Sequence, residues 1–586
     1  MTLTLAAVYA PQAFTPGRTG RLLIEFALTL AGAVLVSGFI ALTLTPMMCS
    51  RLLRHEASPG PLSRGIEAVL RWVTAGYRRA LSAVLSVRWL VALGVVGCFV
   101  ATVLMWTNMK SELAPTEDRG VMLASFTAPE GSSIQYTTEY AKRIERIAME
   151  VPEVDRVFVV ASNPTVERGV ASLRMADWAD RERRVPEMLE ELLPQLLSVP
   201  GVNAYALAPP SLGQPYRSRP FSMVVITSDT YEKLQAGAEP LLAHLRSWPG
   251  LQGVETDLRL DKPELRLWID RERAADAGVS METIGRVLET SLGGRRVTRF
   301  RKDGEQFEVI VQLDPAGRTS PDDISDILVA GRGDTLLPLS SLLRAEETVG
   351  PKELNHFSQR RALAITANLG PGTSQGEALA HAQAAAERLL PQGFVVDWDG
   401  QSREYFQSSS SQMLTLVLAL LFIYLVLAAQ FESFVDPLII ISTVPLSMVG
   451  GLLLLELGGG TINVYSKIGL ITLIGLITKH GILIVEFANQ LRDRGSPIRE
   501  AVIEAASLRL RPILMTTGAM VLGAVPLALA TGAGAESRQQ IGLVVVGGMS
   551  LGTVLTLFVV PSVYMLFTRR HREPVLDHRE ALESAT

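Results

Sequence analysis

Long apolar runs constrain the fold of this sequence more than any other feature. A helix that crosses the hydrocarbon core of a bilayer needs about 20 mainly apolar residues. Seven runs approach or exceed that length, namely Phe26–Leu53, Trp89–Thr107, Met413–Ala429, Pro437–Leu457, Ile468–Ala488, Ile513–Ala530 and Ile541–Phe567. The composition agrees, because 48% of the residues are hydrophobic and 19% are charged. The sequence therefore predicts a multi-pass membrane protein.

Basic residues between the runs predict which side of the membrane each connection occupies. Lys and Arg concentrate in short cytoplasmic loops. The connection between the first two runs carries Arg51, Arg54, Arg64, Arg71, Arg78, Arg79 and Arg88. Within it, apolar residues recur every three or four positions from Ile66 to Val84. We therefore expect residues 58–87 to form a cytoplasmic amphipathic helix that lies along the membrane surface.

The charged and reactive residues exclude several other classes of protein. A formal net charge of −4 gives no basic excess that would bind nucleic acid. Cys49 and Cys98 lie apart in apolar runs and the histidines are scattered, so we expect no metal site. The sequence has no glycine-rich phosphate loop and no nucleophile–base pattern. We therefore expect neither ATP hydrolysis nor another enzymatic activity, and no bound cofactor.

Residues 110–411 lie between two runs and have the composition of a soluble domain. Periodicity in the first part predicts the order β-α-β-β-α-β, at Val121–Phe126, Ile134–Val151, Val157–Ala161, Ala171–Met175, Val185–Ser198 and Val202–Leu207. This order is that of a ferredoxin-like module. Glu117 and Asp118 precede it in a loop, where we expect them to be solvated.

A second module of the same kind follows, but its elements are not contiguous. We assign its first elements to Phe221–Ile226, Thr230–Ser247, Gly253–Leu258, Glu264–Ile269 and Met281–Ser291. Its closing elements are Ala362–Asn368, Ser374–Leu390 and Phe394–Asp397. Residues 293–361 then form an inserted lobe of strands and loops. The predicted fold class is an α+β membrane protein: a transmembrane α-helical bundle with a large external domain of ferredoxin-like modules and an inserted lobe.

Five local strings carry a family resemblance. They are Pro115–Gly120 (PTEDRG), Ala428–Phe434 (AAQFESF), Ser466–Gly469 (SKIG), Lys479–Phe487 (KHGILIVEF) and Arg509–Thr516 (RLRPILMT). With these strings in this order, and with the predicted spans and doubled outer module, the chain resembles the C-terminal half of a resistance-nodulation-division (RND) transporter. The resemblance covers essentially the whole chain. Among the branches of that superfamily, the hydrophobe/amphiphile (multidrug) exporters fit best.

A complete member of that family has six spans and an outer module, followed by six more spans and a second module. By that resemblance, residues 1–57 hold the end of a fifth span, at Thr2–Phe14, and a full sixth span. Residues 88–109 form the next span, 110–411 the periplasmic porter modules with the docking insertion, 412–570 a five-helix block and 571–586 a cytoplasmic tail. We therefore expect an N-terminally truncated transporter.

Charged residues at membrane depth point to a proton relay. A charge there costs on the order of 3 kcal/mol or more and normally marks an ion or proton pathway. Lys479 lies well inside its run, and Glu486 follows two helical turns later on the same face. The resemblance places Lys479, Arg509 and Thr516 at the relay positions of a family driven by the proton motive force. It places their acidic partners, two adjacent aspartates, in a fourth span that precedes this sequence.

Some of these residues also have an ordinary structural explanation. Glu486 and Arg509 lie near the cytoplasmic ends of their runs, where a long side chain reaches the interface at little cost. Thr516 alone would be a helix hydroxyl that bonds its own backbone. Glu486 is therefore only a possible relay residue, whereas the depth of Lys479 favours a functional role.

The resemblance also places a substrate-path loop at Ser162–Gly169. In drug exporters of the family this loop is rich in glycine and phenylalanine, but here it is short and has no aromatic residue. Aromatic walls grip apolar and cationic molecules. Glu167 and Arg168 could instead select amphiphiles with polar heads. The alternative is an exposed charged turn without a role in transport.

The inserted lobe at 293–361 resembles the docking region of the family. The resemblance implies a homotrimer in the bacterial inner membrane, a periplasmic adaptor and an outer-membrane channel. The implied function is the permease subunit of a tripartite proton-driven efflux system for amphiphilic or hydrophobic compounds. One alternative is a non-transporting remnant, or a half-transporter that needs a separate N-terminal half. Another is a heavy-metal exporter, whose methionine or acidic ligands would line a path that Met47, Met48 and Met515 do not form.

Overall fold

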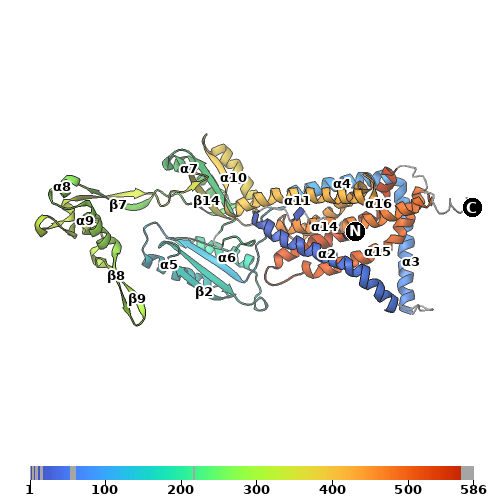
Figure 1. Cartoon of the computed structure of the whole chain (residues 1–586), viewed down its shortest axis with the longest axis horizontal. Coiled ribbons are helices and arrows are strands. Elements are labelled where there is room, and N and C mark those ends of the chain that lie inside the picture. The colour runs from blue at the N-terminus through green and yellow to red at the C-terminus, as the bar shows by residue number, and fades with distance from the viewer. Residues whose placement is uncertain are drawn as a thin grey trace, which may run out of the picture.

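The computed structural model describes residues 17–52, 61–215 and 218–568, together with Thr2, Ala6, Tyr9, Pro11 and Gln12. The predicted tail at 571–586 and most of the predicted partial span at Thr2–Phe14 lie outside these residues. The described chain is elongated and has three regions in a row: a helical bundle, a pair of α+β modules and a lobe (Figure 1).

Seven helical segments of the described chain are long and apolar enough to cross a membrane. They contain α2 (Gly17–Leu52), α4 (Arg88–Asn108), α11 (Gly400–Phe431), the pair α12 (Asp436–Ile441) and α13 (Thr443–Leu457), α14 (Val464–Asp493), α15 (Ile498–Ala528) and α16 (Ala535–Phe567). Each overlaps one of the predicted apolar runs. The membrane protein predicted from composition is therefore confirmed as a bundle of long apolar helices.

The centre of the bundle is formed by α13, α14 and α16, whose backbones approach closely. A Cβ atom added to Gly450 of α13 would lie 2.6 Å from the carbonyl oxygen of Gly547 on α16. Helices that meet without a gap need such small residues at their contact, because side chains would hold the backbones apart. By contrast, most apolar side chains of α2 and α4 are exposed, and α15 exposes one face that includes Leu508, Met515 and Leu522. These outer helices therefore offer apolar surface to lipid or to further helices.

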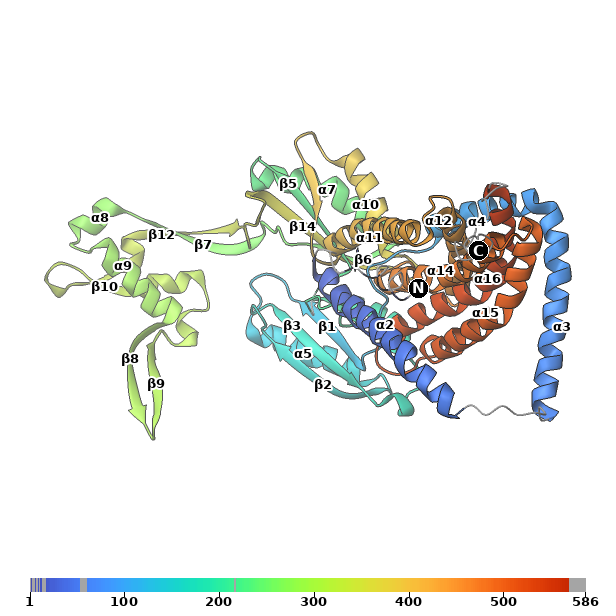
Figure 2. The same ribbon diagram turned by 45° about the vertical axis from the view of Figure 1, so that its right-hand side comes forward.

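Helix α3 (Pro61–Val84) crosses one end of the bundle instead of running along it (Figure 2). Its apolar stripe buries Tyr77 and Leu81, and the Tyr77 hydroxyl donates to the carbonyl of Leu557 at 2.6 Å. The opposite stripe leaves Trp72 exposed. The helix is therefore amphipathic, and its place along a cytoplasmic membrane surface stays a prediction.

The first α+β module consists of β1 (Val121–Thr127), α5 (Ile134–Met149), β2 (Val154–Ala161), β3 (Arg168–Met175), α6 (Val185–Leu197) and β4 (Asn203–Leu207). Its antiparallel sheet has the order β2-β3-β1-β4, which confirms the ferredoxin-like module. The alternation of buried and partly exposed residues explains why β1 forms a strand. Every second residue (Met122, Ala124 and Phe126) is buried beneath the helices.

The second module has the same topology with a long interruption. It contains β5 (Phe221–Thr227), α7 (Tyr231–Ser247), β6 (Leu251–Thr256), β14 (Arg360–Leu369), α10 (Gln375–Leu389) and β15 (Val395–Trp398). Strand β14 lies between β5 and β6, and β15 pairs with the other edge of β5. The short strand β13 (His356–Phe357) also pairs with β14.

The predicted start of the inserted lobe at residue 293 is wrong. Strand β7 (Lys262–Ile269) does not join the sheet of the second module but pairs with β12 (Leu343–Gly350) in a two-stranded ribbon. Helix α9 (Met281–Leu288) lies beyond this ribbon, in the lobe (Figures 1 and 2). Glu264–Ile269 and Met281–Ser291 therefore belong to the lobe, because alternation identifies a strand but not its distant partner.

The lobe has its own small core and a projecting hairpin. Buried side chains include Ala274 from α8 (Arg271–Asp276), Ile284 from α9 and Val329 from β10 (Leu328–Ala330), which pairs with β11 (Leu336–Pro338). The hairpin of β8 (Arg295–Lys302) and β9 (Glu305–Val311) extends away from this core (Figure 2). The two strands β7 and β12 connect the lobe to the second module.

Candidate transport site

Helix α14 carries a charged residue, Lys479, near the middle of its length. Asn463 caps the helix, since its side-chain oxygen accepts hydrogen bonds from the N–H groups of Tyr465 and Ser466, at 2.9 and 3.1 Å. Ser466 completes the capping box by accepting from the Asn463 N–H at 2.8 Å. The fixed start of this 30-residue helix places Lys479 near its middle.

Lys479 lines an open cavity between α14 and α2. The cavity has a volume of about 370 Å³, and its α2 wall consists of Leu30, Ala33, Val34, Ser37, Gly38 and Ala41. Among the residues that the structure describes, none forms a hydrogen bond or an ion pair with the ammonium group of Lys479. A cation at this depth needs an anionic partner. The open side of the cavity is where a further helix could supply one.

The other predicted relay residues do not contact Lys479 directly. The guanidinium carbon of Arg509 lies 4.6 Å from the ring centroid of Phe487 on α14. Within the described ranges, the buried Nε of Arg509 has no hydrogen-bond partner, and Glu486 is partly exposed and forms no ion pair with it. The Thr516 hydroxyl donates to the carbonyls of Pro512 and Ile513, each at 3.0 Å.

A polar cluster at the centre of the bundle was not predicted. His480, which follows Lys479, is 0% exposed, and its Nε2 lies 3.4 Å from Oγ1 of Thr517 on α15. Its Nδ1 lies 3.4 Å from Oγ1 of Thr553 on α16, and the two threonine oxygens are 3.2 Å apart. The available signal was a histidine inside an apolar run. The threonines are far away in sequence, so no local pattern could connect them.

A second unpredicted network lies at the α3 end of the bundle. Asn489 on α14 donates to Oδ2 of Asp436 at 3.1 Å and accepts from the Tyr564 hydroxyl at 2.5 Å. Arg492 donates to the same hydroxyl at 3.2 Å. Asp436 and Tyr564 are buried, so this network joins α12, α14 and α16 through polar groups in an apolar setting.

The predicted substrate-path loop, Ser162–Gly169, is anchored to Lys352, which lies in the segment between β12 and β13. Oε1 of Glu167 accepts hydrogen bonds from Nζ of Lys352 at 2.7 Å and from Oγ1 of Thr165 at 2.8 Å. Lys352 also donates to Oε1 of Glu130 at 2.5 Å. Burial opposes ionisation of Glu167, but the bonds from Lys352, the backbone and Thr165 prevail and lower its pKa to about 2. Glu167 is therefore an anchor whose side chain is only 13% exposed, and not the exposed charged turn of the alternative explanation; Arg168 is partly buried.

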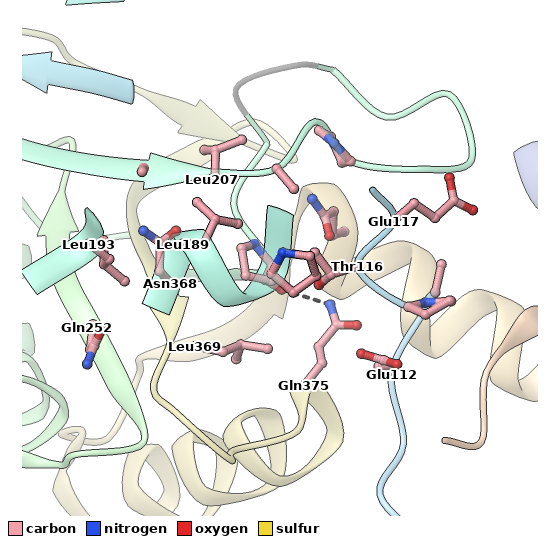
Figure 3. Close-up of a pocket in the computed structure, with 18 of the residues that line it drawn as sticks. Glu112, Thr116, Glu117, Leu189, Leu193, Leu207, Gln252, Asn368, Leu369 and Gln375 are labelled. Carbon is pink, nitrogen blue, oxygen red and sulfur yellow. Dashed lines mark hydrogen bonds between the residues drawn. The ribbon is translucent and has the colours of Figure 1, made fainter. Parts of the chain in front are cut away.

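A cavity of about 320 Å³ lies between the two modules, close to the bundle. Figure 3 shows Leu189 and Leu207 gathered around it together with Asn368 and Glu112. Asn368 is 6% exposed, and in the described chain neither its amide nitrogen nor its amide oxygen has a hydrogen-bond partner. The cavity therefore combines apolar walls with buried polar atoms that are free to bind a ligand.

Glu112 gives this cavity a group that titrates near neutral pH. Burial raises the pKa of its carboxyl to about 7, against the opposing effects of a hydrogen bond from Thr461 and the charge of Lys110. The Thr461 hydroxyl donates to Oε1 of Glu112 at 2.6 Å. An isolated glutamate after a span has no distinctive pattern, so the sequence alone does not point to Glu112.

Glu117 and Asp118 are buried, so the expectation that they are solvated is wrong. Glu117 accepts from Ser537 at the start of α16 and pairs with Arg119 at 2.7 Å. Asp118 accepts from the N–H of Val185 at 3.1 Å, at the start of α6. The two carboxylates thus connect the first module to the bundle, and their partners Ser537 and Val185 come from distant parts of the sequence.

Comparison with known proteins agrees with this architecture. The profile of the AcrB/AcrD/AcrF family matches residues 1–568. A protein of Haemophilus influenzae (strain ATCC 51907 / DSM 11121 / KW20 / Rd), described as an uncharacterized transporter, is 38% identical over 588 aligned residues. The alignment covers 99% of this chain and 57% of that protein, so the chain spans little more than half the length of this relative. The chain belongs to the AcrB/AcrD/AcrF family of RND transporters.

Proposed function

We propose that this chain contributes to an inner-membrane, proton-driven exporter of hydrophobic and amphiphilic compounds. The observation that carries the proposal is the position of Lys479, whose ammonium group lies near the middle of a membrane helix and faces an open cavity. Such a charge is costly unless a carboxylate neutralises it. A carboxylate that gains and loses a proton would attract and release Lys479, and this exchange would couple proton flow to helix movement.

Arg509 and Thr516 remain proposed members of the relay, and Glu486 a possible one. Arg509 stacks on Phe487, the neighbour of Glu486, so a small shift of α15 against α14 changes the surroundings of both charges. Thr516 bonds carbonyls of its own helix in the described arrangement. Its relay role would require its hydroxyl to turn toward a partner outside α15.

The cavity between the modules supports amphiphiles as the transported class. Its leucines suit an apolar body, and the free amide groups of Asn368 suit a polar head. The described residues contain no group of three or more His, Cys, Asp or Glu side chains that could hold a metal ion.

The lobe supports assembly with further proteins. The β8–β9 hairpin leaves Val297, Phe300, Phe307 and Ile310 exposed on a projecting arm. Apolar side chains on such an arm are typical of a contact surface. We propose that this arm meets a neighbouring protomer in a homotrimer, and that the lobe meets a periplasmic adaptor and an outer-membrane channel.

Efflux of dyes and drugs from an exporter-deficient bacterium tests the proposal. The chain is expressed alone and together with a companion that supplies an outer module and a span with paired aspartates. Efflux that needs both parts and disappears in Lys479→Met would support a proton-driven exporter. Lys142→Met, on the exposed face of α5, serves as the control and should leave efflux unchanged.

Two results would contradict the proposal. Efflux that survives Lys479→Met would remove Lys479 from the relay. An absence of efflux with both parts inserted in the membrane would favour the alternative of a non-transporting remnant.

A further inference from the structure

His480 is a titratable side chain at the centre of the bundle for which the proposed relay has no role. It is fully buried, and α15 and α16 each present a threonine hydroxyl to one of its ring nitrogens. A buried imidazole without partners would be costly in either protonation state. Here the ring on α14 has a hydrogen-bond partner on α15 and another on α16, which indicates a specific polar site at the contact of three helices.

The two threonines behave differently from their neighbour Thr516. A threonine inside a helix commonly donates to the carbonyl one turn earlier, as Thr516 does. In the described chain, the hydroxyls of Thr517 and Thr553 instead contact His480 and each other. Both hydroxyls are therefore available to the imidazole.

The cluster can hold a neutral or a charged imidazole. In the neutral ring, Nδ1–H donates to Thr553, Thr553 donates to Thr517 and Thr517 donates to Nε2, which closes a ring of hydrogen bonds. An added proton forms one N–H bond at Nε2. The Thr517 hydroxyl then accepts from Nε2 and turns its own hydrogen toward a carbonyl of α15. Loss of the proton reverses these changes, and the charge of the cluster changes by one in each direction.

We infer that His480, held by Thr517 and Thr553, is a second site that takes up and releases a proton, and that a charged Lys479 disfavours its protonation. This inference rests on the proposed proton-driven function. Lys479 is the charged residue next to His480, and the groups that α15 and α16 present to the ring are neutral hydroxyls. Two positive charges in a poorly hydrated interior repel strongly. Neutralisation of Lys479 by its carboxylate partner would therefore favour protonation of His480.

The direct test is ¹⁵N NMR of this chain, labelled at histidine, purified and placed in lipid, with a titration between pH 4 and 9. Loss of a signal in His480→Asn assigns His480. We expect its nitrogen shifts to change with pH, and we expect Lys479→Met to move that change by about one unit to higher pH, because a neighbouring positive charge is removed. Shifts that stay those of a neutral imidazole throughout, or that ignore Lys479→Met, would overturn the inference.

A transport assay tests whether this site is used. His480→Asn keeps hydrogen-bonding groups but cannot carry a proton, so we expect the pH midpoint of efflux to shift by about one unit. His244→Asn, on the second module, is the matched control and should leave the pH profile unchanged. An unchanged profile in His480→Asn would also overturn the inference. If the parent protein shows no efflux, the proposed function fails, and the NMR titration still decides whether His480 carries a proton.

Discussion

Nζ of Lys352 lies 2.7 Å from Oε1 of Glu167, and this ion pair ties the predicted substrate-path loop to the segment that leaves the lobe. Lys352 also bonds Glu130 at 2.5 Å, and the side chains of Lys352 and Glu130 are only 9% and 6% exposed. A buried pair of this kind fixes geometry more than it adds stability. The loop therefore cannot move independently of Lys352.

Lys352→Met should destabilise the domain severely, because it removes the only cation paired with Glu167 in the described chain and leaves Glu130 with its longer pair to Arg259, at 3.5 Å. We expect a loss of about 3–5 kcal/mol. The measurement is the thermal unfolding midpoint of the purified protein in detergent. Lys142→Met breaks an exposed pair with Glu139 and should change the midpoint little. Equal midpoints for the two variants would contradict the anchoring role.

The same cluster should weaken in acid. The pKa of Glu167 is lowered to about 2, so the folded state favours its ionised form. The stabilisation is therefore complete above the unfolded value of about 4.3 and is lost as pH falls from about 5 toward 2. Protease cleavage within Ser162–Gly169 should accelerate over that range. In Glu167→Gln the contribution of this residue to the pH dependence should vanish, and an unchanged dependence would refute the assignment.

Glu112 should make binding of cationic amphiphiles depend on pH near neutrality. Its pKa is raised to about 7, so its charge appears as pH rises from 6 to 8. The pH dependence of stability has the opposite sign from that of Glu167. Because the pKa of Glu112 is raised in the folded state, this residue stabilises the fold at low pH, and the contribution is lost as pH rises through 7. Fluorescence polarisation with a cationic dye should show tighter binding at pH 8 than at pH 6. Glu112→Gln should remove that difference, and a neutral dye should never show it.

Asn368→Leu should weaken ligand binding without lowering the stability of the fold. The amide of Asn368 has no partner in the described chain, so removing it costs the fold nothing and should leave the unfolding midpoint equal or higher. Amphiphiles with a polar head should bind about five- to tenfold more weakly, which corresponds to roughly one hydrogen bond. Asn203→Leu, on the exposed end of β4, is the control for both measurements. Unchanged affinity would show that the cavity does not bind the polar head.

Tyr564→Phe should loosen the α3 end of the bundle. The Tyr564 hydroxyl donates to Asn489 at 2.5 Å and accepts from Arg492 at 3.2 Å, so its removal takes one hydrogen-bond partner from each of these partly buried side chains. We expect a loss of about 1–3 kcal/mol, measured as a lower unfolding midpoint in detergent. Tyr424→Phe removes an exposed hydroxyl that donates to Phe434 at 3.3 Å and should have a smaller effect. The reverse ranking would argue against the network.

Local sequence patterns predict the fold correctly where elements that follow one another in the sequence also lie side by side in the structure. The first module was predicted correctly because β1 to β4 follow one another without interruption. The strand at Lys262–Ile269 was misassigned because its partner begins at Leu343, after the whole lobe. The depth of Lys479 was evident from its apolar flanks.

Partners that lie far apart in sequence explain most of what was missed. His480 acquires its surroundings from Thr517 and Thr553, which no periodicity links to it. Glu167 looked like a solvated turn because Lys352 is 185 residues away. In each case the residue type was visible in the sequence, but its partner was determined by the packing of separate elements.

The ribbon that carries the lobe has a mechanical consequence. Strands β7 and β12 are in register from Ile269 opposite Leu343 to Lys262 opposite Gly350, and a slip of one residue would turn every side chain to the wrong face. The ribbon can therefore bend but not lengthen. Just beyond it, the Lys352 N–H bonds the Arg259 carbonyl at 2.8 Å, which clamps the two strands together where they reach the modules. A neighbouring protein that tilted the lobe would therefore pull on Glu167 through Lys352, so that a force applied at the end of the molecule would reach the loop in its central region.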